Sequence, residues 1–307
     1  MSNIKLFRLV ENEVEEISGT PMAIEKSLQT LIERHLETFL GVRFLASEYV
    51  TTRSHGGRID TLGIDETNSP VIVEYKRALN ENVINQGLFY LTWLLDHKAD
   101  FQLLVMKKLG QGAANLINWP YPRLVCIAGD FTKYDIHAIE QMPQNIDLIR
   151  YRRYGKDLIL LEQVASSSNA TVFNPGRLIP PQDSSDETHS TASTSEQTAT
   201  LNLQSLPHDL QDWFHSLKAF VLGLGDDIEE RTLPKYIAFR RLKTFAYFNF
   251  QRTKNRIAID VPLPPNTVPT EEDFTQQLPK NYLRIFVDSS EDVERAQPII
   301  ALAYEKS

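Results

Sequence analysis

The sequence predicts an α/β fold over residues 20–165 and a small α+β region over residues 201–307. Strand-like and helix-like patterns alternate through the first part, which is typical of a sheet covered by helices on both faces. Between the two parts, residues 182–200 include ten serines or threonines and no large apolar side chain. Such a stretch cannot bury enough surface to offset its chain entropy. We therefore expect two domains, 1–165 and 201–307, joined by a flexible Ser/Thr-rich linker over 166–200.

The chain is predicted to open with a small hairpin over residues 1–19, ahead of the core. The first core helix is predicted to follow at once, because Thr20 suits an N-cap and Pro21 suits the first helical position. Apolar residues then recur at helical spacing up to residue 40.

A second hairpin is predicted over residues 58–76. Residues 58–65 and 71–75 are apolar-rich and strand-like, and the residues between them, Glu-Thr-Asn-Ser-Pro, are a turn signal. Both runs are apolar on both faces, which favours central strands covered on each side over an amphipathic surface hairpin.

Three charged residues of this hairpin are candidates for a functional site. A turn centred near Thr67 places Asp60 directly across from Glu74, with the two Cβ atoms about 5 Å apart. Lys76 follows Glu74 by two residues and so projects from the same face. Opposed carboxylates repel, and buried carboxylates need a counter-charge. A divalent cation such as Mg²⁺, which prefers oxygen ligands, would remove the conflict.

The spacing of these residues resembles the Asp…Glu-x-Lys pattern of the PD-(D/E)XK nuclease superfamily. The resemblance covers roughly residues 20 to 130. In detail, this stretch is similar to the catalytic domain of NucS-type and RecB-like endonucleases. The residues that carry it are Gly57, Asp60, the run 71–77 with Glu74 and Lys76, Val83, Gln86 and Tyr90. One departure is that Ile59 precedes Asp60, where the superfamily's name has proline.

The resemblance implies a restriction-endonuclease-like fold, with a central mixed sheet flanked by helices. It also implies a Mg²⁺- or Mn²⁺-dependent endonuclease that hydrolyses phosphodiester bonds in DNA, in repair or in defence against foreign DNA. The implied metal ligands are Asp60, Glu74, the main-chain carbonyl near Tyr75, and Glu25 of the first helix. Lys76 would stabilise or position the nucleophile, and Gln86 would assist it.

Other interpretations of the same residues remain open. Glu74 could form an ion pair with Lys76 or Arg58 in an ordinary hairpin, and Glu25 and Gln86 could be solvated surface residues. The fold could also serve as a non-cleaving nucleic-acid- or protein-binding module, or as a regulatory partner in a repair or defence system. An intact carboxylate pair argues against a pure binding module, which has no need of opposed acids.

The rest of the first domain continues the alternation of elements. The predicted series is a helix over 83–97, a strand over 101–106, a helix over 110–117, a strand over 124–128, a helix over 132–141, and paired strands over 146–151 and 158–164.

The second domain is predicted to contain two helices and three strands: a helix over 210–224, strands over 236–242, 245–251 and 256–261, and a helix over 292–305. It looks like an uncharacterised domain often found behind NucS-like nuclease domains. Basic residues gather around its strands, so Arg240, Arg241 and Lys243, together with Arg77 of the first domain, are candidate phosphate contacts. Alternatively, the interleaved aromatics are sheet core and the basic residues are its rim.

Composition sets further bounds on function. The net charge of −8 argues against a protein that coats DNA non-specifically. A single cysteine, Cys126, excludes an intrachain disulfide and fits a reducing compartment. We see no signal peptide and no apolar stretch long enough to cross a bilayer, so we expect a cytoplasmic protein with no membrane partner. A homodimer would suit an enzyme that cuts both strands of a duplex.

Overall fold

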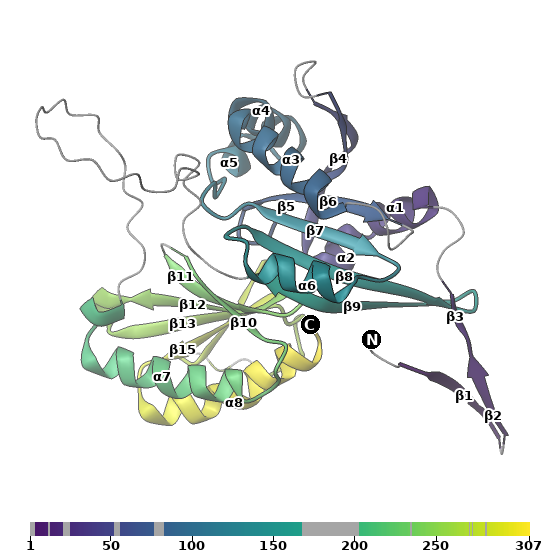
Figure 1. Cartoon of the computed structure of the whole chain (residues 1–307). Coiled ribbons are helices and arrows are strands. Elements are labelled where there is room, and N and C mark those ends of the chain that lie inside the picture. Colours follow the sequence, from purple (N-terminus) through teal and green to yellow (C-terminus); the bar gives the residue numbers. More distant parts are fainter. Residues whose placement is uncertain are drawn as a thin grey trace, which may run out of the picture. The chain divides into compact units, whose positions relative to one another are not determined.

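The chain folds as two compact units, Met1–Phe173 and Asn174–Ser307, drawn in Figure 1 from a computed structural model. The structure describes residues 4–11, 13–20, 25–51, 56–76, 83–167, 203–233, 235–269, 271, 273–279 and 281–307. The predicted linker lies outside the described residues from position 168 to its end at position 200.

Unit 1 is a mixed α/β unit. Its strands are β1 (Leu6–Val10), β2 (Glu13–Ile17), β3 (Gly19–Thr20), β4 (Val42–Val50), β5 (Arg58–Asp65), β6 (Pro70–Lys76), β7 (Arg123–Ala128), β8 (Asn145–Tyr154) and β9 (Leu158–Ser167). Its helices are α1 (Glu25–Arg34), α2 (Leu36–Leu40), α3 (Val83–Asp96), α4 (Lys98–Leu109), α5 (Gln111–Ala114) and α6 (Lys133–Glu140).

The main sheet of unit 1 is mixed: among its described strands, two pairs are parallel and four are antiparallel. Its described strands follow the order β3-β8-β7-β6-β5-β4, and β9 also pairs with β8. Strands β4, β5 and β6 run antiparallel, whereas β6, β7 and β8 run parallel. The change of direction falls on β6, the strand that carries Glu74 and Lys76. The predicted α/β class, with a central mixed sheet flanked by helices, is confirmed.

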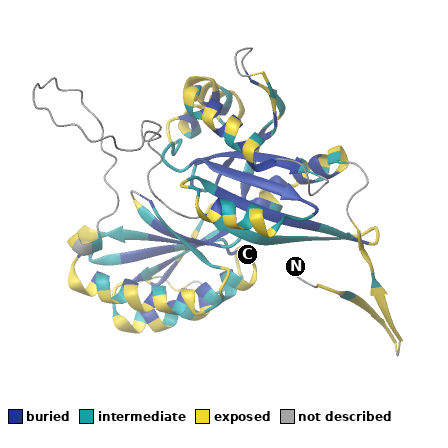
Figure 2. Cartoon of the chain, viewed as in Figure 1, coloured by how far each residue is buried: buried dark blue, intermediate teal, exposed yellow. Residues whose placement is uncertain are grey.

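Helices cover both faces of the central strands. Tyr75 and Glu74 are neighbours in β6 and therefore point to opposite faces. On the Tyr75 face, Glu33 of α1 accepts a hydrogen bond from Thr61 of β5. On the Glu74 face, Gln86 of α3 donates a hydrogen bond to Glu74. All of β6 up to Tyr75 and all of β7 are buried, as the dark strands of Figure 2 show. The expected double covering is confirmed.

One predicted strand is wrong. Residues 101–106 belong to helix α4, in which Phe101 and Val105 are the buried side chains. Those two residues are four apart and share one helical face, while Leu103 and Met106 are exposed. A six-residue apolar run fits either a buried strand or one face of a helix, and here the helix forms. As a result β7 pairs directly with β6, with α3, α4 and α5 as the crossover between them.

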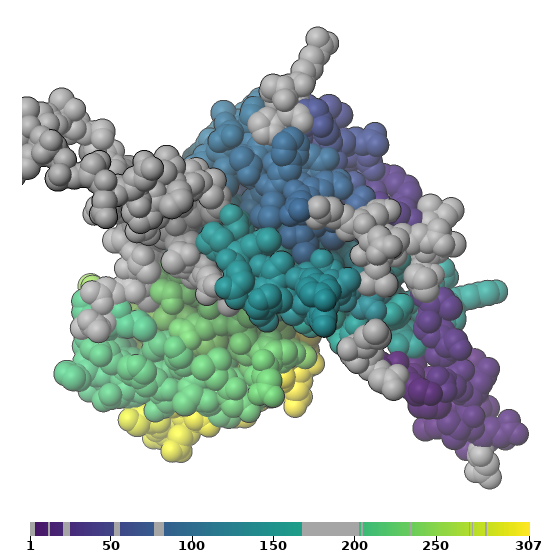
Figure 3. Space-filling model, in the orientation of Figure 1, coloured from purple at the N-terminus to yellow at the C-terminus, as the bar shows by residue number. Residues whose placement is uncertain are grey.

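The start of unit 1 also differs from the prediction. Thr20 is not an N-cap but pairs with Arg153 as part of β3. Helix α1 begins at Glu25, and Pro21 lies outside the described residues. The predicted N-terminal hairpin is confirmed as β1 and β2, which pair with each other in a separate two-stranded sheet. Both strands are exposed over most of their length (Figure 2), and Figure 3 shows their atoms in purple.

Unit 2 is a six-stranded antiparallel sheet with two helices packed on it. Its described strands are β10 (Glu229–Thr232), β11 (Tyr236–Arg240), β12 (Thr244–Gln251), β13 (Arg256–Val261), β14 (Thr275–Leu278) and β15 (Tyr282–Val287), in the order β10-β11-β12-β13-β15-β14. Its helices are α7 (His208–Leu222) and α8 (Ser290–Glu305), with short 3₁₀ turns at η2 (Leu203–Ser205) and η3 (Arg252–Lys254). The three predicted strands and two predicted helices are present, and β10, β14 and β15 were not foreseen.

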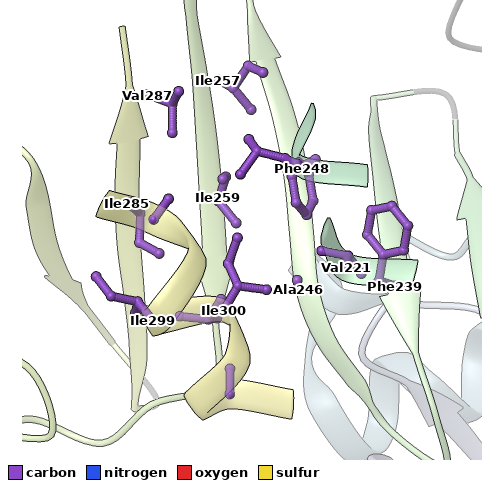
Figure 4. Packing of buried hydrophobic residues seen from close by; sticks show 14 of the residues in the cluster. Val221, Phe239, Ala246, Phe248, Ile257, Ile259, Ile285, Val287, Ile299 and Ile300 are labelled. Carbon is purple, nitrogen blue, oxygen red and sulfur yellow. The ribbon is translucent and has the colours of Figure 1, made fainter. Parts of the chain in front are cut away.

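The core of unit 2 lies between one face of this sheet and the two helices. Figure 4 shows Ile300 of α8 and Val221 of α7 among the β-branched and aromatic side chains of β11, β12, β13 and β15. Phe239 and Phe248 meet edge to face there, with ring centroids 5.1 Å apart. No helix among the described residues is long and apolar enough to span a bilayer.

Candidate functional site

The β5–β6 hairpin places Asp60 and Glu74 side by side. Thr61 pairs with Val73 in the register of the two strands, so Asp60 and Glu74 are the next opposed residues. The main-chain N–H of Asp60 donates to Glu74 Oε1 at 3.2 Å. The main-chain N–H of Tyr75 donates in turn to Asp60 Oδ2 at 3.1 Å. The pairing predicted from the turn signal is confirmed, and the backbone of each strand orients the carboxylate of the other.

Burial makes this carboxylate pair electrostatically unfavourable. Glu74 is fully buried, and burial, followed by the neighbouring Asp60 charge, raises its pKa to about 9. Burial also raises the pKa of Asp60, against the opposing effects of the Tyr75 N–H and Lys76. Without a cation the pair therefore holds a proton near neutral pH, and it titrates as one coupled system.

Lys76 and Glu25 lie at the edge of the same site. The Lys76 ammonium is 3.9 Å from Glu25 Oε1, and its side chain is 18% exposed. The Lys76 charge lowers the pKa of both Asp60 and Glu74, which shows that it is within electrostatic reach of the pair. Glu25 is the first residue of α1, and Lys76 is the last residue of β6. The structure thus brings together the two carboxylates, Lys76 and Glu25 as the sequence suggested.

Helix α3 presents Gln86 to the buried carboxylate. Gln86 Nε2 donates to Glu74 Oε2 at 2.9 Å. The helix can approach this closely because Gly87 faces the sheet: a Cβ there would lie 2.4 Å from Leu124 Cδ1 of β7. Farther along α3, the Tyr90 hydroxyl accepts a hydrogen bond from the main-chain N–H of Arg58 at 3.2 Å, at the start of β5.

Sequence reasoning missed Gln29, which ties α1 to the site. Its side chain is 4% exposed, and its Nε2 donates to the main-chain carbonyl of Asp60 at 2.8 Å and to Glu33 at 2.9 Å. Gln29 adjoins Leu28 on the buried side of α1. A polar residue at the margin of an apolar stripe is ordinarily a surface residue, so nothing in the sequence marked it.

The oxygen donors of this site fit a hard divalent cation. Two opposed carboxylates, one of them fully buried, offer oxygen ligands where a positive charge would relieve the raised pKa of both. Within the described part of the chain, no group of three or more His, Cys, Asp and Glu side chains is arranged to hold a metal. The site therefore offers two carboxylates, and further ligands would have to come from main-chain oxygen, such as that of Tyr75, and from water. The Tyr75 phenol cannot contribute, because it is buried on the opposite face beside Thr61.

The four residues predicted to contact phosphate have different outcomes in the structure. Arg77 lies outside the described residues. The prediction for Arg240 is wrong, because its side chain is 3% exposed and its Nε lies 3.2 Å from Glu229 in unit 2. Arg241 is paired with Asp227 and lies over a tyrosine ring. Lys243 is half-buried on the same turn.

The aromatic residues interleaved with these bases lie largely in the sheet core: Phe239, Phe245, Tyr247 and Phe248 are buried, and Phe250 packs against the same cluster. Of the two interpretations left open by the sequence, the structural one holds for the aromatics.

The chain is similar to one protein-family model, one relative and one solved structure. Residues 198–307 match a family model described as a domain of unknown function, DUF5655. An uncharacterized protein of Haemophilus influenzae (strain ATCC 51907 / DSM 11121 / KW20 / Rd) is 27% identical over 267 residues, 84% of each chain. A solved structure described as "Structure of EndoMS-dsDNA2 complex" is 16% identical, with a TM-score of 0.26 over 48% of this chain. That match spans 64% of the other chain, less than two thirds of its length.

Proposed function

We propose that unit 1 is a Mg²⁺- or Mn²⁺-dependent endonuclease that hydrolyses phosphodiester bonds, with DNA as its substrate. The observation that supports this most strongly is the buried pair of Asp60 and Glu74, opposed across β5 and β6 with raised pKa values. Burying like charges destabilises a fold unless a function needs them together. A shared divalent cation gives both carboxylates a reason to be there.

Each residue of the site has a role in this proposal. Asp60 and Glu74 would hold the cation with the main-chain carbonyl of Tyr75, and Glu25 would act on it through a bound water. When bound, the cation would offset charge on the scissile phosphate and lower the pKa of a bound water.

The remaining side chains would act on the reacting groups. Lys76 would stabilise charge that develops on the phosphate, or orient the attacking water. Gln86 keeps Glu74 Oε2 in a fixed direction by its hydrogen bond of 2.9 Å. The water would attack the phosphorus directly, so no covalent intermediate with the protein is formed. Because the P–O bond breaks by water attack, the products would be one phosphate-terminated end and one hydroxyl-terminated end.

The test is cleavage of labelled DNA by the purified full chain, with Mg²⁺, with Mn²⁺ and with EDTA. Panels of single-stranded, duplex, mismatched and branched DNA, with matching RNA, define the substrate. We expect cleavage that needs the metal and that is lost in Asp60→Asn and Glu74→Gln. Glu37→Gln, which neutralises an exposed carboxylate on α2, is the matched control and should cleave normally.

Metal binding gives an independent measurement. Calorimetric titration with Mn²⁺ should detect a site in the wild type and in Glu37→Gln that is weakened in Asp60→Asn and Glu74→Gln. Equal Mn²⁺ affinity in all four proteins would refute the metal site. Tight nucleic-acid binding without cleavage of any substrate, with either metal, would replace the enzyme with a non-cleaving binding module.

A further inference from the structure

A second charged cluster borders the carboxylate pair. Glu48 of β4 accepts a hydrogen bond from Lys26 Nζ of α1 at 2.6 Å, and its other oxygen lies 2.5 Å from Arg58 Nε of β5. Lys26 and Arg58 nevertheless keep 55% and 63% of their side chains exposed. One carboxylate therefore bridges two accessible cations, and the cluster carries a net positive charge. The Lys26 hydrogen bond lowers the pKa of Glu48, so this carboxyl is an anion at neutral pH.

The cluster lies next to Asp60. The β4–β5 pairs on either side of Glu48 set it level with Asp60 across the strands. The Glu48 charge contributes to the raised pKa of Asp60. Lys26 also donates to Gln29 Oε1 at 3.1 Å, and Gln29 donates to the Asp60 carbonyl. Arg58 precedes Asp60 by two residues on the same strand, and its main chain is fixed by Tyr90.

The backbone of Glu48 is in an unusual conformation for this place. Its φ is +52°, in the left-handed region that residues other than glycine rarely adopt. Glu48 is level with Asp60, and its carboxylate adds a third negative charge near the pair. Lys26 and Arg58 hold that carboxylate between them.

We propose that Lys26 and Arg58 form a binding site for a backbone phosphate of the nucleic acid, and that Glu48 fills this site as an internal anion until a phosphate displaces it. A phosphodiester, like a carboxylate, presents two anionic oxygens to N–H donors, and arginine binds both kinds of group well. The inference rests on the proposed function of unit 1. It adds the direction in which the strand would cross the site, over β5 toward α1.

Because Glu48 is an internal anion, removing its charge should change the DNA affinity in the opposite direction to removing either cation. Removing the charge of Glu48 releases both cations, so it tightens binding. Removing either cation weakens binding and lowers the salt dependence of the affinity by about one in slope per contact. If Glu48 acts only by occupying these cations, its removal has no effect once both cations are gone.

The experiment measures binding of fluorescein-labelled 20-mer DNA, single-stranded and duplex, to the full chain by anisotropy in EDTA across a salt series. Variants are Glu48→Gln, Lys26→Ala with Arg58→Ala, and all three together. Glu37→Gln is the matched control, since it removes one negative charge from an exposed position of α2. We expect Glu48→Gln to bind about 3- to 10-fold tighter and the double variant about 10-fold weaker or more. The triple variant should match the double variant, and Glu37→Gln should match the wild type.

The same proteins are assayed for Mn²⁺-dependent cleavage, which separates this inference from the proposed function. The phosphate site is overturned if the double variant binds like the wild type, or if Glu48→Gln and Glu37→Gln have equal effects. Where the wild type cleaves DNA, the nuclease assignment survives such a result. A wild type that binds but never cleaves overturns the nuclease and leaves the phosphate site to be judged by its variants. A wild type that neither binds nor cleaves overturns both.

Discussion

Replacing Glu74 with glutamine should stabilise the protein in the absence of metal, and the gain should grow with pH. Burial and Asp60 raise the pKa of Glu74 from 4.5 to about 9 in the folded protein. The unfolded chain therefore loses this proton near pH 4.5, whereas the folded protein keeps it until about pH 9. Between pH 4.5 and about 9 the folded protein binds more protons at Glu74 than the unfolded chain does. The stability of the wild type therefore falls as pH rises through this range.

The size of the gain follows from the same two values. Each pH unit above 4.5 lowers the wild-type stability by about 1.4 kcal/mol, which gives about 3 kcal/mol at pH 7. Glutamine has no proton to lose, so Glu74→Gln avoids this loss. It also keeps the local hydrogen bonds: its oxygen can accept from the Asp60 N–H, and Gln86 can turn its amide to accept from the new NH₂. The variant should match the wild type near pH 4.5 and exceed it by about 3 kcal/mol at pH 7.

Urea unfolding in EDTA at pH 4.5, 6, 7 and 8 measures this difference. The chain has three tryptophans, of which Trp93 and Trp119 belong to the core of unit 1 and Trp213 packs in unit 2. In a Trp213→Phe background, tryptophan fluorescence reports the unfolding of unit 1 alone. Glu37→Gln serves as the control and should show no pH-dependent gain. A Glu74→Gln gain that is equal at all four pH values, or a loss at pH 7, would refute the assignment of a buried, protonated carboxyl.

The remaining predictions concern one catalytic and two structural positions. Lys76→Ala should lower the cleavage rate about 10²- to 10³-fold, since it removes charge stabilisation in the transition state, while DNA affinity in EDTA changes little. Gly87→Ala should destabilise unit 1 by about 1–3 kcal/mol in urea, because the new methyl group would meet Leu124 at 2.4 Å. Arg240→Met should destabilise unit 2 by about 1.5–3 kcal/mol, since Glu229 would lose one charged partner while keeping Arg231, and Trp213 fluorescence would report it.

Each of these has a matched control. Lys107→Ala removes an exposed lysine from the end of α4 and should leave the cleavage rate unchanged. Gly112→Ala places a methyl group in open space on α5 and should not destabilise. Lys243→Ala removes a basic residue three positions beyond Arg240 and should leave unit 2 stable. Equal effects in a variant and its control would count against the structural reason given.

The sequence predicted the carboxylate pair because the information for it is local. The turn signal between the two apolar runs sets the register of β5 and β6, and the register alone brings Asp60 and Glu74 together. Gln86 could be placed because it lies in the first turn of a helix that follows β6 closely. Short range in the chain and a strict two-residue alternation made these residues predictable.

What the sequence did not predict depends on distant partners. The run at 101–106 fits a strand or a helix equally, and packing of Phe101 and Val105 against the rest of the core decides it. Arg240 reads as a surface base until Glu229 is placed beside it by the pairing of β10 with β11. Glu48 gives no signal in the sequence, because its partners come from α1 and β5.

The local origin of the carboxylate pair has a consequence for folding kinetics. The β5–β6 hairpin closes over few residues, so it can form within microseconds while Glu74 is still hydrated and ionised. The elements that bury Glu74, α3 and β7, come later in the chain and must dock on the finished hairpin. Proton uptake therefore accompanies the covering of the hairpin rather than its formation. We expect docking to be the step of folding that slows as pH rises, and refolding of Glu74→Gln to lose that pH dependence.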